Sequence, residues 1–85
     1  MTVGDLIKQL EKLDSTKLVV LSKDAEGNTF SPLADIDDTM VYKAEASWYG
    51  YVGFDALTGK LKSLGFDEAD IIEDGTPCVI LWSIN

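Results

Sequence analysis

The sequence of 85 residues contains no histidine, no arginine and a single cysteine. Histidine is the side chain that most often transfers protons near neutral pH, so its absence argues against most acid–base and nucleophilic enzymes. Arginine supplies the guanidinium that binds phosphates bidentately, and its absence argues against direct binding to nucleic acid or to an anionic membrane. We therefore expect a protein that is not an enzyme and that holds no cofactor.

Cysteine, basic leaders and long apolar runs are equally scarce. Cys78 has no second cysteine with which to form an internal disulfide, and an inert core thiol in a cytoplasmic protein is expected. The N-terminus lacks a basic segment followed by an apolar one, so no signal peptide is predicted. Apolar runs reach only about five residues, well below the ~18 that span a bilayer, and no membrane-spanning segment is expected.

Apolar residues, in contrast, are plentiful enough for folding. Hydrophobic side chains make up 46% of the chain and no low-complexity tract is present, which predicts one folded domain over residues 1–85. A domain of this length buries only ~60–65% of its unfolded surface, so its core is thin. Stability is therefore expected to be modest unless two copies pair.

Two segments have the pattern of helices. Residues 2–14 place apolar side chains at helical spacing, with Thr2 as the N-cap and Asp5 as the capping-box acid. Residues 55–64 form a second candidate, capped by Asp55 and ended by Gly65 in a left-handed conformation. Residues 67–70 are predicted to begin one further helical turn. The first helix is expected to pack its apolar stripe, Val3, Leu6, Ile7, Leu10 and Leu13, on a sheet.

Three segments are predicted strands: 17–22, 39–46 and 77–83. The first and last are apolar on both faces, so they are placed at the centre of the sheet, with Trp82 in the core or at a subunit interface. Residues 23–29 and 35–38 are predicted turns, 48–54 an ordered aromatic loop, and Pro32 an edge or connection. The predicted fold is α+β, a two-layer sandwich with a three- to four-stranded, mainly antiparallel sheet and two helices on one face.

A central strand with two apolar faces needs cover on both sides. Two short helices cover only one side of such a sheet. The aromatic segment 48–54 or a second subunit must supply the other cover, and we expect a homodimer.

Negative charge is the most distinctive property of the sequence. Fifteen acidic residues against seven lysines give a net charge of −8, and residues 24–42 and 63–85 each contain five acids and no lysine. Such a surface steers the chain toward a basic partner or imitates the phosphates of DNA, although solubility alone also favours acidic surfaces. The aromatic side chains of residues 48–54 are either interface anchors or the filling of a thin core, and Tyr49 and Tyr51 are expected to reach the surface. The predicted partner-binding residues are Asp24, Glu26, Asp35, Asp37, Asp38, Trp48, Tyr49, Tyr51, Asp67, Glu68, Asp70, Glu73 and Asp74.

The first third of the chain carries a family resemblance. Leu6, Leu10, Leu13 and Asp14 precede residues 19–33, which read Val-Val-Leu-Ser-Lys-Asp-Ala-Glu-Gly-Asn-Thr-Phe-Ser-Pro-Leu. In these features the chain resembles a group of small proteins of tailed phages and prophages. The resemblance implies an accessory factor that acts on a host protein in the host cytoplasm. Phage proteins of this size and charge include inhibitors of CRISPR effectors, restriction enzymes and DNA glycosylases, and some of them imitate DNA.

Two other functions remain open from the sequence. Asp24, Glu26 and Asn28 alternate like the first ligands of a calcium loop, but the glycine comes too early and the later bidentate acid is missing. A small-ligand or divalent-metal module using the carboxylates of 24–28 or 35–38 is the first alternative. A dimeric structural accessory protein without an inhibitory role is the second. The favoured hypothesis is an acidic interaction protein that binds or inhibits a host protein.

Overall fold

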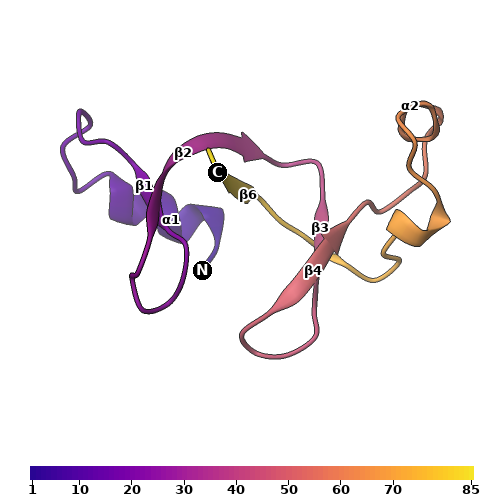
Figure 1. Ribbon diagram of the computed structural model, residues 1–85, viewed down its shortest axis with the longest axis horizontal. Coiled ribbons are helices and arrows are strands. Elements are labelled where there is room, and N and C mark those ends of the chain that lie inside the picture. The colour runs from indigo at the N-terminus through magenta and orange to yellow at the C-terminus, as the bar shows by residue number, and fades with distance from the viewer. The chain divides into compact units, whose positions relative to one another are not determined.

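A computed structural model describes residues 1–85, and it confirms the α+β fold (Figure 1). Contacts along the chain divide it into two compact units. We call Met1–Ile36 with Leu81–Asn85 the carrier unit, and Asp37–Ile80 the inserted unit. In chain order the elements are α1 (Val3–Leu10), β1 (Val20–Ser22), β2 (Phe30–Asp37), β3 (Val41–Ala44), β4 (Gly50–Gly53), α2 (Gly59–Ser63), the 3₁₀ helix η1 (Glu68–Asp70), β5 (Thr76–Pro77) and β6 (Ile80–Ser83).

Helix α1 begins where the sequence predicts. Thr2 accepts a hydrogen bond from the Asp5 backbone N–H at 3.1 Å, and Asp5 accepts one from the Thr2 backbone N–H at 3.0 Å, which completes the capping box. The predicted end at residue 14 is wrong, because the helix ends at Leu10 and two turns follow. Leu13 therefore lies beyond the helix, on the segment that leads to β1.

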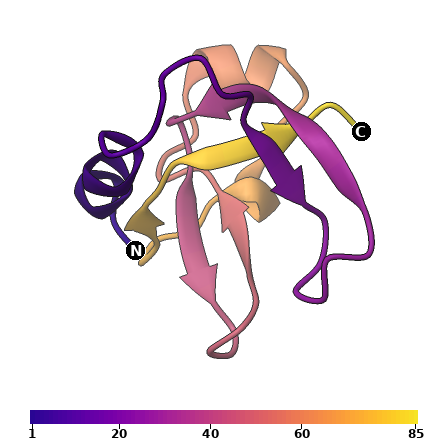
Figure 2. The same cartoon turned by 90° about the vertical axis from the view of Figure 1, so that its left-hand side faces the viewer.

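Strands β1, β2 and β6 form a three-stranded sheet in that order (Figure 2). The prediction that 17–22 lies at the sheet centre is wrong, since β1 is an edge strand and β2 is central. Pro32 is compatible with this place because the register pairs it with Val20, while the Leu33 N–H donates to Val19 O at 3.2 Å. Hydrogen-bonded and non-hydrogen-bonded pairs alternate along an antiparallel ladder, so the Pro32 nitrogen faces away from β1. The N–H that proline lacks therefore removes no hydrogen bond between β1 and β2.

The predicted turn at 35–38 is largely strand. Asp35, Ile36 and Asp37 belong to the end of β2. The chain turns only afterwards, where Asp37 accepts hydrogen bonds from the backbone N–H of Thr39 at 2.8 Å and from its hydroxyl. Asp37, which the sequence places in the turn, is thus the last residue of β2 and stabilises the turn through its side chain.

The second sheet lies in the inserted unit and has the order β4-β3-β5. Both pairings are antiparallel, with Tyr42 opposite Val52 in one and Thr76 in the other. Residues 50–53 of the aromatic segment predicted as a loop therefore form strand β4, while Trp48 and Tyr49 remain in the loop before it. The structure has two three-stranded sheets in place of one continuous sheet containing 17–22, 39–46 and 77–83. Of the two helices, α1 belongs to the carrier unit and α2 to the inserted unit.

Helix α2 is shorter than predicted. Its N-cap is Thr58, whose hydroxyl accepts from the Leu61 N–H at 3.2 Å, so Asp55 is not the cap. The predicted ending is confirmed: Gly65 has φ +97°, and the Phe66 N–H reaches back to Leu61 O at 3.1 Å. The turn predicted at 67–70 is η1, with Asp67 and Asp70 forming a reciprocal capping box.

The C-terminal apolar run is divided between the two sheets. β5 ends at Pro77 and β6 begins at Ile80, while Cys78 bonds to Met40 O through its N–H at 3.3 Å and its Sγ at 3.5 Å. The predicted central strand 77–83 is thus wrong, because β5 and β6 are each at the edge of a sheet. Trp82 is 48% exposed and does not belong to the core.

The buried core is very small. Val41 and Ile72 are the only buried hydrophobic side chains, and both belong to the inserted unit. In the carrier unit only Ser31 is buried, and its hydroxyl has no hydrogen-bond partner. The apolar stripe of α1, predicted to pack on a sheet, is about half exposed. The carrier unit therefore lacks an apolar interior of its own.

Candidate functional site

The loop between β3 and β4 presents an aromatic pair. Trp48 is 82% exposed and Tyr49 45%, and their ring centroids lie 4.5 Å apart in a tilted arrangement. The N–H groups of Glu45 and Ala46 both donate to Tyr49 O at 3.1 Å, which closes the loop. In both views this hairpin extends away from α2 (Figures 1 and 2). We call Trp48 and Tyr49 the hairpin tip.

Tyr51 belongs to the same hairpin. It lies opposite Lys43 in the β3–β4 register and is 46% exposed. The sequence therefore identified three exposed aromatic residues of one hairpin. Exposed aromatic groups of this kind are the anchors that most often dominate protein interfaces.

Most of the candidate carboxylates stabilise the fold locally. Asp24 accepts from the backbone N–H of Glu26 at 2.9 Å and of Asn28 at 3.1 Å, and these bonds lower the pKa of Asp24 below its ordinary value. Asp35 accepts from the Ile36 N–H at 2.8 Å. Asp67 and Asp70 cap η1. These groups add to the negative potential of the surface, but their oxygen atoms already have structural partners.

Other carboxylates have few or no side-chain partners. Glu26 accepts only a long bond from the Asn28 amide at 3.4 Å. Asp38, Glu68 and Glu73 are exposed and make no side-chain hydrogen bond or ion pair. Of the predicted acidic residues, these are the ones whose carboxylates remain open to a partner.

Glu68 and Glu73 line one hollow in the inserted unit. The hollow has a volume of about 490 Å³, and its other lining residues are the half-buried Leu57 and Ile71. A parallel bridge between Phe54 and Ile71 fixes this segment to the end of β4, with the Ile72 N–H donating to Phe54 O at 2.9 Å. We call this the acidic hollow. The sequence supplied both glutamates as candidates but gave no signal that they meet over two apolar side chains.

Asp74 has a different role from the other candidates. Its carboxylate forms an ion pair with Lys43 on β3, and this hydrogen-bonded pair lowers the pKa of Asp74 and raises the pKa of Lys43. The pair joins the segment before β5 to the middle of the second sheet. Asp74 therefore holds a structural contact and is not a free partner-binding group.

The pH dependence of this ion pair can be tested with Asp74→Asn. Because the pKa of Asp74 is lowered, the contribution of its carboxylate to the free energy of unfolding is complete above pH 3.8. This contribution is lost as the pH falls through the lower folded-state pKa. Because the pKa of Lys43 is raised, the contribution of its ammonium group to the free energy of unfolding is complete below pH 10.5. It is lost as the pH rises through the higher folded-state pKa. Melting curves should show Asp74→Asn less stable than wild type by a constant margin between these limits, and equal in stability in strong acid.

Asp55→Asn is the matched control for this experiment. Asp55 is exposed and has no side-chain partner, so its substitution should leave the melting temperature unchanged. An Asp74→Asn difference that keeps its size in strong acid would contradict an origin in the ion pair.

A metal-binding site finds no support in the geometry. No group of three or more acidic, histidine or cysteine side chains lies close enough to hold an ion. The alternative based on the carboxylates of 24–28 or 35–38 therefore lacks a ligand set, since calcium takes six to eight oxygen ligands.

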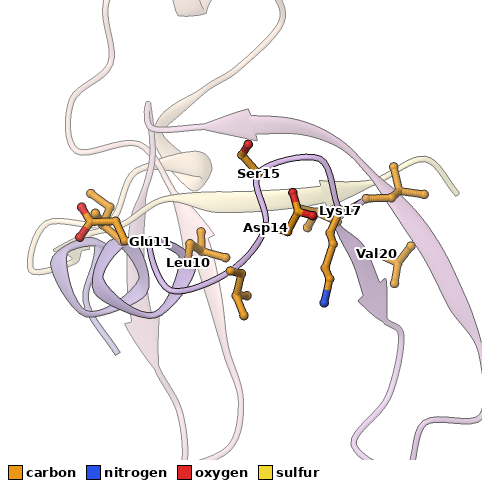
Figure 3. A pocket seen from close by; sticks show the side chains of 10 residues that line it. Leu10, Glu11, Asp14, Ser15, Lys17 and Val20 are labelled. Carbon is orange, nitrogen blue, oxygen red and sulfur yellow. The ribbon is translucent and has the colours of Figure 1, made fainter.

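A second concave surface lies in the carrier unit and was missed at the level of sequence. It is a groove of about 620 Å³ between α1 and β1, lined by Ile7, Leu10 and Glu11, by residues 13–15 and by residues 17–20 (Figure 3). The helical spacing of Ile7 and Leu10 was the available signal, but it was interpreted as a face packed on a sheet. We call this surface the apolar groove.

No family model, curated protein or solved structure matches the chain. None of its helices has the length and apolar character needed to cross a bilayer. The interpretation of the site therefore depends on its own residues.

Proposed function

We propose that this chain is a non-enzymatic interaction protein that binds a basic surface of a host protein in the cytoplasm. The observation that carries the proposal is the hairpin tip, where Trp48 is 82% exposed and its ring lies against that of its neighbour Tyr49. Leaving a large aromatic side chain in water forfeits apolar burial, whereas the same side chain at an interface supplies a binding anchor.

The acidic hollow provides the complementary chemistry. Glu68 and Glu73 offer two carboxylates without other partners, and Leu57 and Ile71 offer apolar contact. A lysine or arginine side chain fits such a site, because its aliphatic stem packs on the apolar residues while its charged head meets the carboxylates. The other acidic residues also favour a basic partner, because their negative potential steers such a partner toward the chain.

Hairpin tip and hollow fall within the reach of one interface. The tip precedes β4 and the hollow is fixed to Phe54, directly after β4. Five residues of extended chain span ~17 Å, which is shorter than the width of a standard interface patch of ~800 Å² per partner. We therefore propose that both contact the same molecule.

The resemblance to phage proteins suggests the class of partner. Enzymes that act on nucleic acid carry the lysine- and arginine-rich surfaces that bind phosphates, and an acidic chain competes for such a surface. In its specific form, the proposal is that the partner is a nucleic-acid-acting defence enzyme and that binding inhibits it.

A charge-neutralising variant tests the hollow. The immobilised chain is used to capture proteins from host lysate at low and at high salt, with identification by mass spectrometry. We expect the Glu68→Gln, Glu73→Gln double variant to lose most of the captured partner, and high salt to weaken capture by wild type, because screening removes exposed charge interactions.

The control removes the same charge from the same unit. Asp38→Asn with Asp55→Asn replaces two exposed acids of the inserted unit that lie outside both the hairpin tip and the acidic hollow, and this variant should retain the partner. If both double variants lose it equally, only net charge matters and the hollow is not the contact. If no protein shows salt-sensitive capture, the proposed function is wrong.

A further inference from the structure

We infer that the apolar groove is the contact surface for a second copy of this chain, giving a two-fold dimer through the carrier unit. The inference concerns a different unit from the proposed partner site and does not depend on it. It begins from the groove's lining and from the lack of buried apolar residues in the carrier unit.

The carrier unit does not cover its own apolar side chains. Val3, Ile7 and Leu10 are 53%, 48% and 47% exposed on one face of α1. The groove continues this face along the segment after the helix and onto β1. Its remaining large apolar residues are Leu13, Leu18, Val19 and Val20, with exposures between 46% and 78%. An amphipathic helix that leaves its stripe in water gains little from folding unless another surface covers it.

The exposed area matches what a small dimer needs. Together these half-exposed side chains present roughly 300 Å² of apolar surface on each chain. Two copies facing each other bury about 600 Å², and since apolar atoms form a little over half of a typical interface, the total is about 1,000 Å². That is the lower bound for a specific interface.

Charge identifies the occupant as a second copy. Residues 1–23 hold four lysines and three acids, whereas the rest of the chain holds three lysines and twelve acids. Two molecules of net charge −8 therefore repel through most surfaces, but not through this one. The groove is also bordered by both signs, with Asp14 next to Lys17 and with Glu11 on the side of the helix (Figure 3).

A two-fold contact uses such a mixed border twice. In an isologous interface both copies use the same surface patch. If one residue of the first copy contacts a second residue of the other copy, the symmetry axis repeats that contact with the two copies exchanged. Lys17 of one copy can thus face Glu11 or Asp14 of the other, and the same pair forms again on the opposite side. A border that carries both charge signs therefore complements a second copy of itself better than it complements a partner surface that carries only one sign.

The test is molar mass measured by light scattering over a range of concentrations. Wild type should approach twice the 9.3 kDa chain mass as concentration rises. Ile7→Glu places a charge in the groove and should give a monomer at the same concentrations. Gln9→Glu adds the same charge to the exposed, polar side of α1 and should leave the dimer intact.

A second measurement covers the case in which Ile7→Glu fails to fold. Nitroxide labels are attached to Ser15→Cys at the groove and, separately, to Ser47→Cys beside the hairpin tip, both in a Cys78→Ser background. Strong dipolar coupling between molecules is expected from position 15 and weaker coupling from position 47. A monomeric wild type, a dimer that Ile7→Glu leaves unchanged, or equal coupling at both positions would overturn the inference.

Discussion

Gly53→Ala should destabilise the protein by about 2 to 4 kcal/mol, because an added methyl group has no space at this position. A Cβ built on Gly53 meets Asp70 O at 2.6 Å and two Ile72 side-chain carbons at 2.9 and 3.0 Å. The carbonyl belongs to the backbone and accepts the Phe54 N–H at 2.9 Å, so it cannot move without breaking that bond. Ile72 is one of the two buried hydrophobic residues.

Gly59→Ala is the matched comparison for this prediction. Nothing lies within 4 Å of a Cβ at Gly59, which is the first residue of α2. The same added methyl should stabilise the helix by about 0.5 kcal/mol, because alanine loses less backbone entropy than glycine. Urea unfolding followed by circular dichroism measures both values. A Gly53→Ala midpoint equal to that of wild type would show that β4 and η1 do not approach as closely as described.

Trp48→Ala should weaken partner binding about 30-fold or more without changing stability. Removal of a central aromatic anchor costs about 2 kcal/mol or more at an interface, and each 1.4 kcal/mol is a factor of ten in affinity. The side chain is 82% exposed, so its removal opens no cavity in the isolated chain. Titration calorimetry with the captured partner gives the affinity, and a melting curve gives the stability.

Phe30→Ala controls for a general loss of exposed aromatic surface. Phe30 is 63% exposed and lies on β2 in the carrier unit. Its substitution should leave partner affinity unchanged, while Trp48→Phe should recover part of the loss because it restores an aromatic ring. Equal weakening by Trp48→Ala and Phe30→Ala would place the contact elsewhere or show it to be non-specific.

Local interactions account for the features that were predictable from sequence. The capping boxes at Thr2 and at Asp67 each involve residues three apart, and the helix ending at Gly65 depends on one backbone conformation. Such contacts form among neighbours in the chain, so the sequence pattern is sufficient to predict them.

Strand placement depends on distant partners and was predicted less well. The Gly50–Gly53 segment resembles a loop because its aromatic residues do not alternate, yet it is a strand because β3 pairs with it. Pro32 is expected at an edge, yet it lies on the central strand, where its backbone faces away from β1 and its carbonyl accepts from the Ile84 N–H at 3.1 Å. In both cases the deciding interaction joins residues far apart in sequence, and single-residue preferences do not contain it.

The residues of the candidate site likewise divide into those that the local sequence predicts and those that depend on tertiary contacts. Tyr49 and Tyr51 were expected at the surface and are exposed there, whereas the 82% exposure of Trp48 decides between the interface and core interpretations that the sequence left open. That Glu68 and Glu73 line one hollow with Leu57 was not predictable, because the segment around Ile71 is held by a tertiary contact, the bridge to Phe54. Which carboxylates remain free and which cap a turn was likewise decided by geometry.

The chain path suggests how recognition can change in such a protein. The inserted unit enters after β2 and leaves into β6, and these two strands are neighbours in one sheet. Insertions are tolerated best where their ends lie close together on a framework that stays paired. We therefore expect the inserted unit to be exchangeable: the recognition that we propose for it changes with the segment that is inserted, while β1, β2 and β6 stay paired.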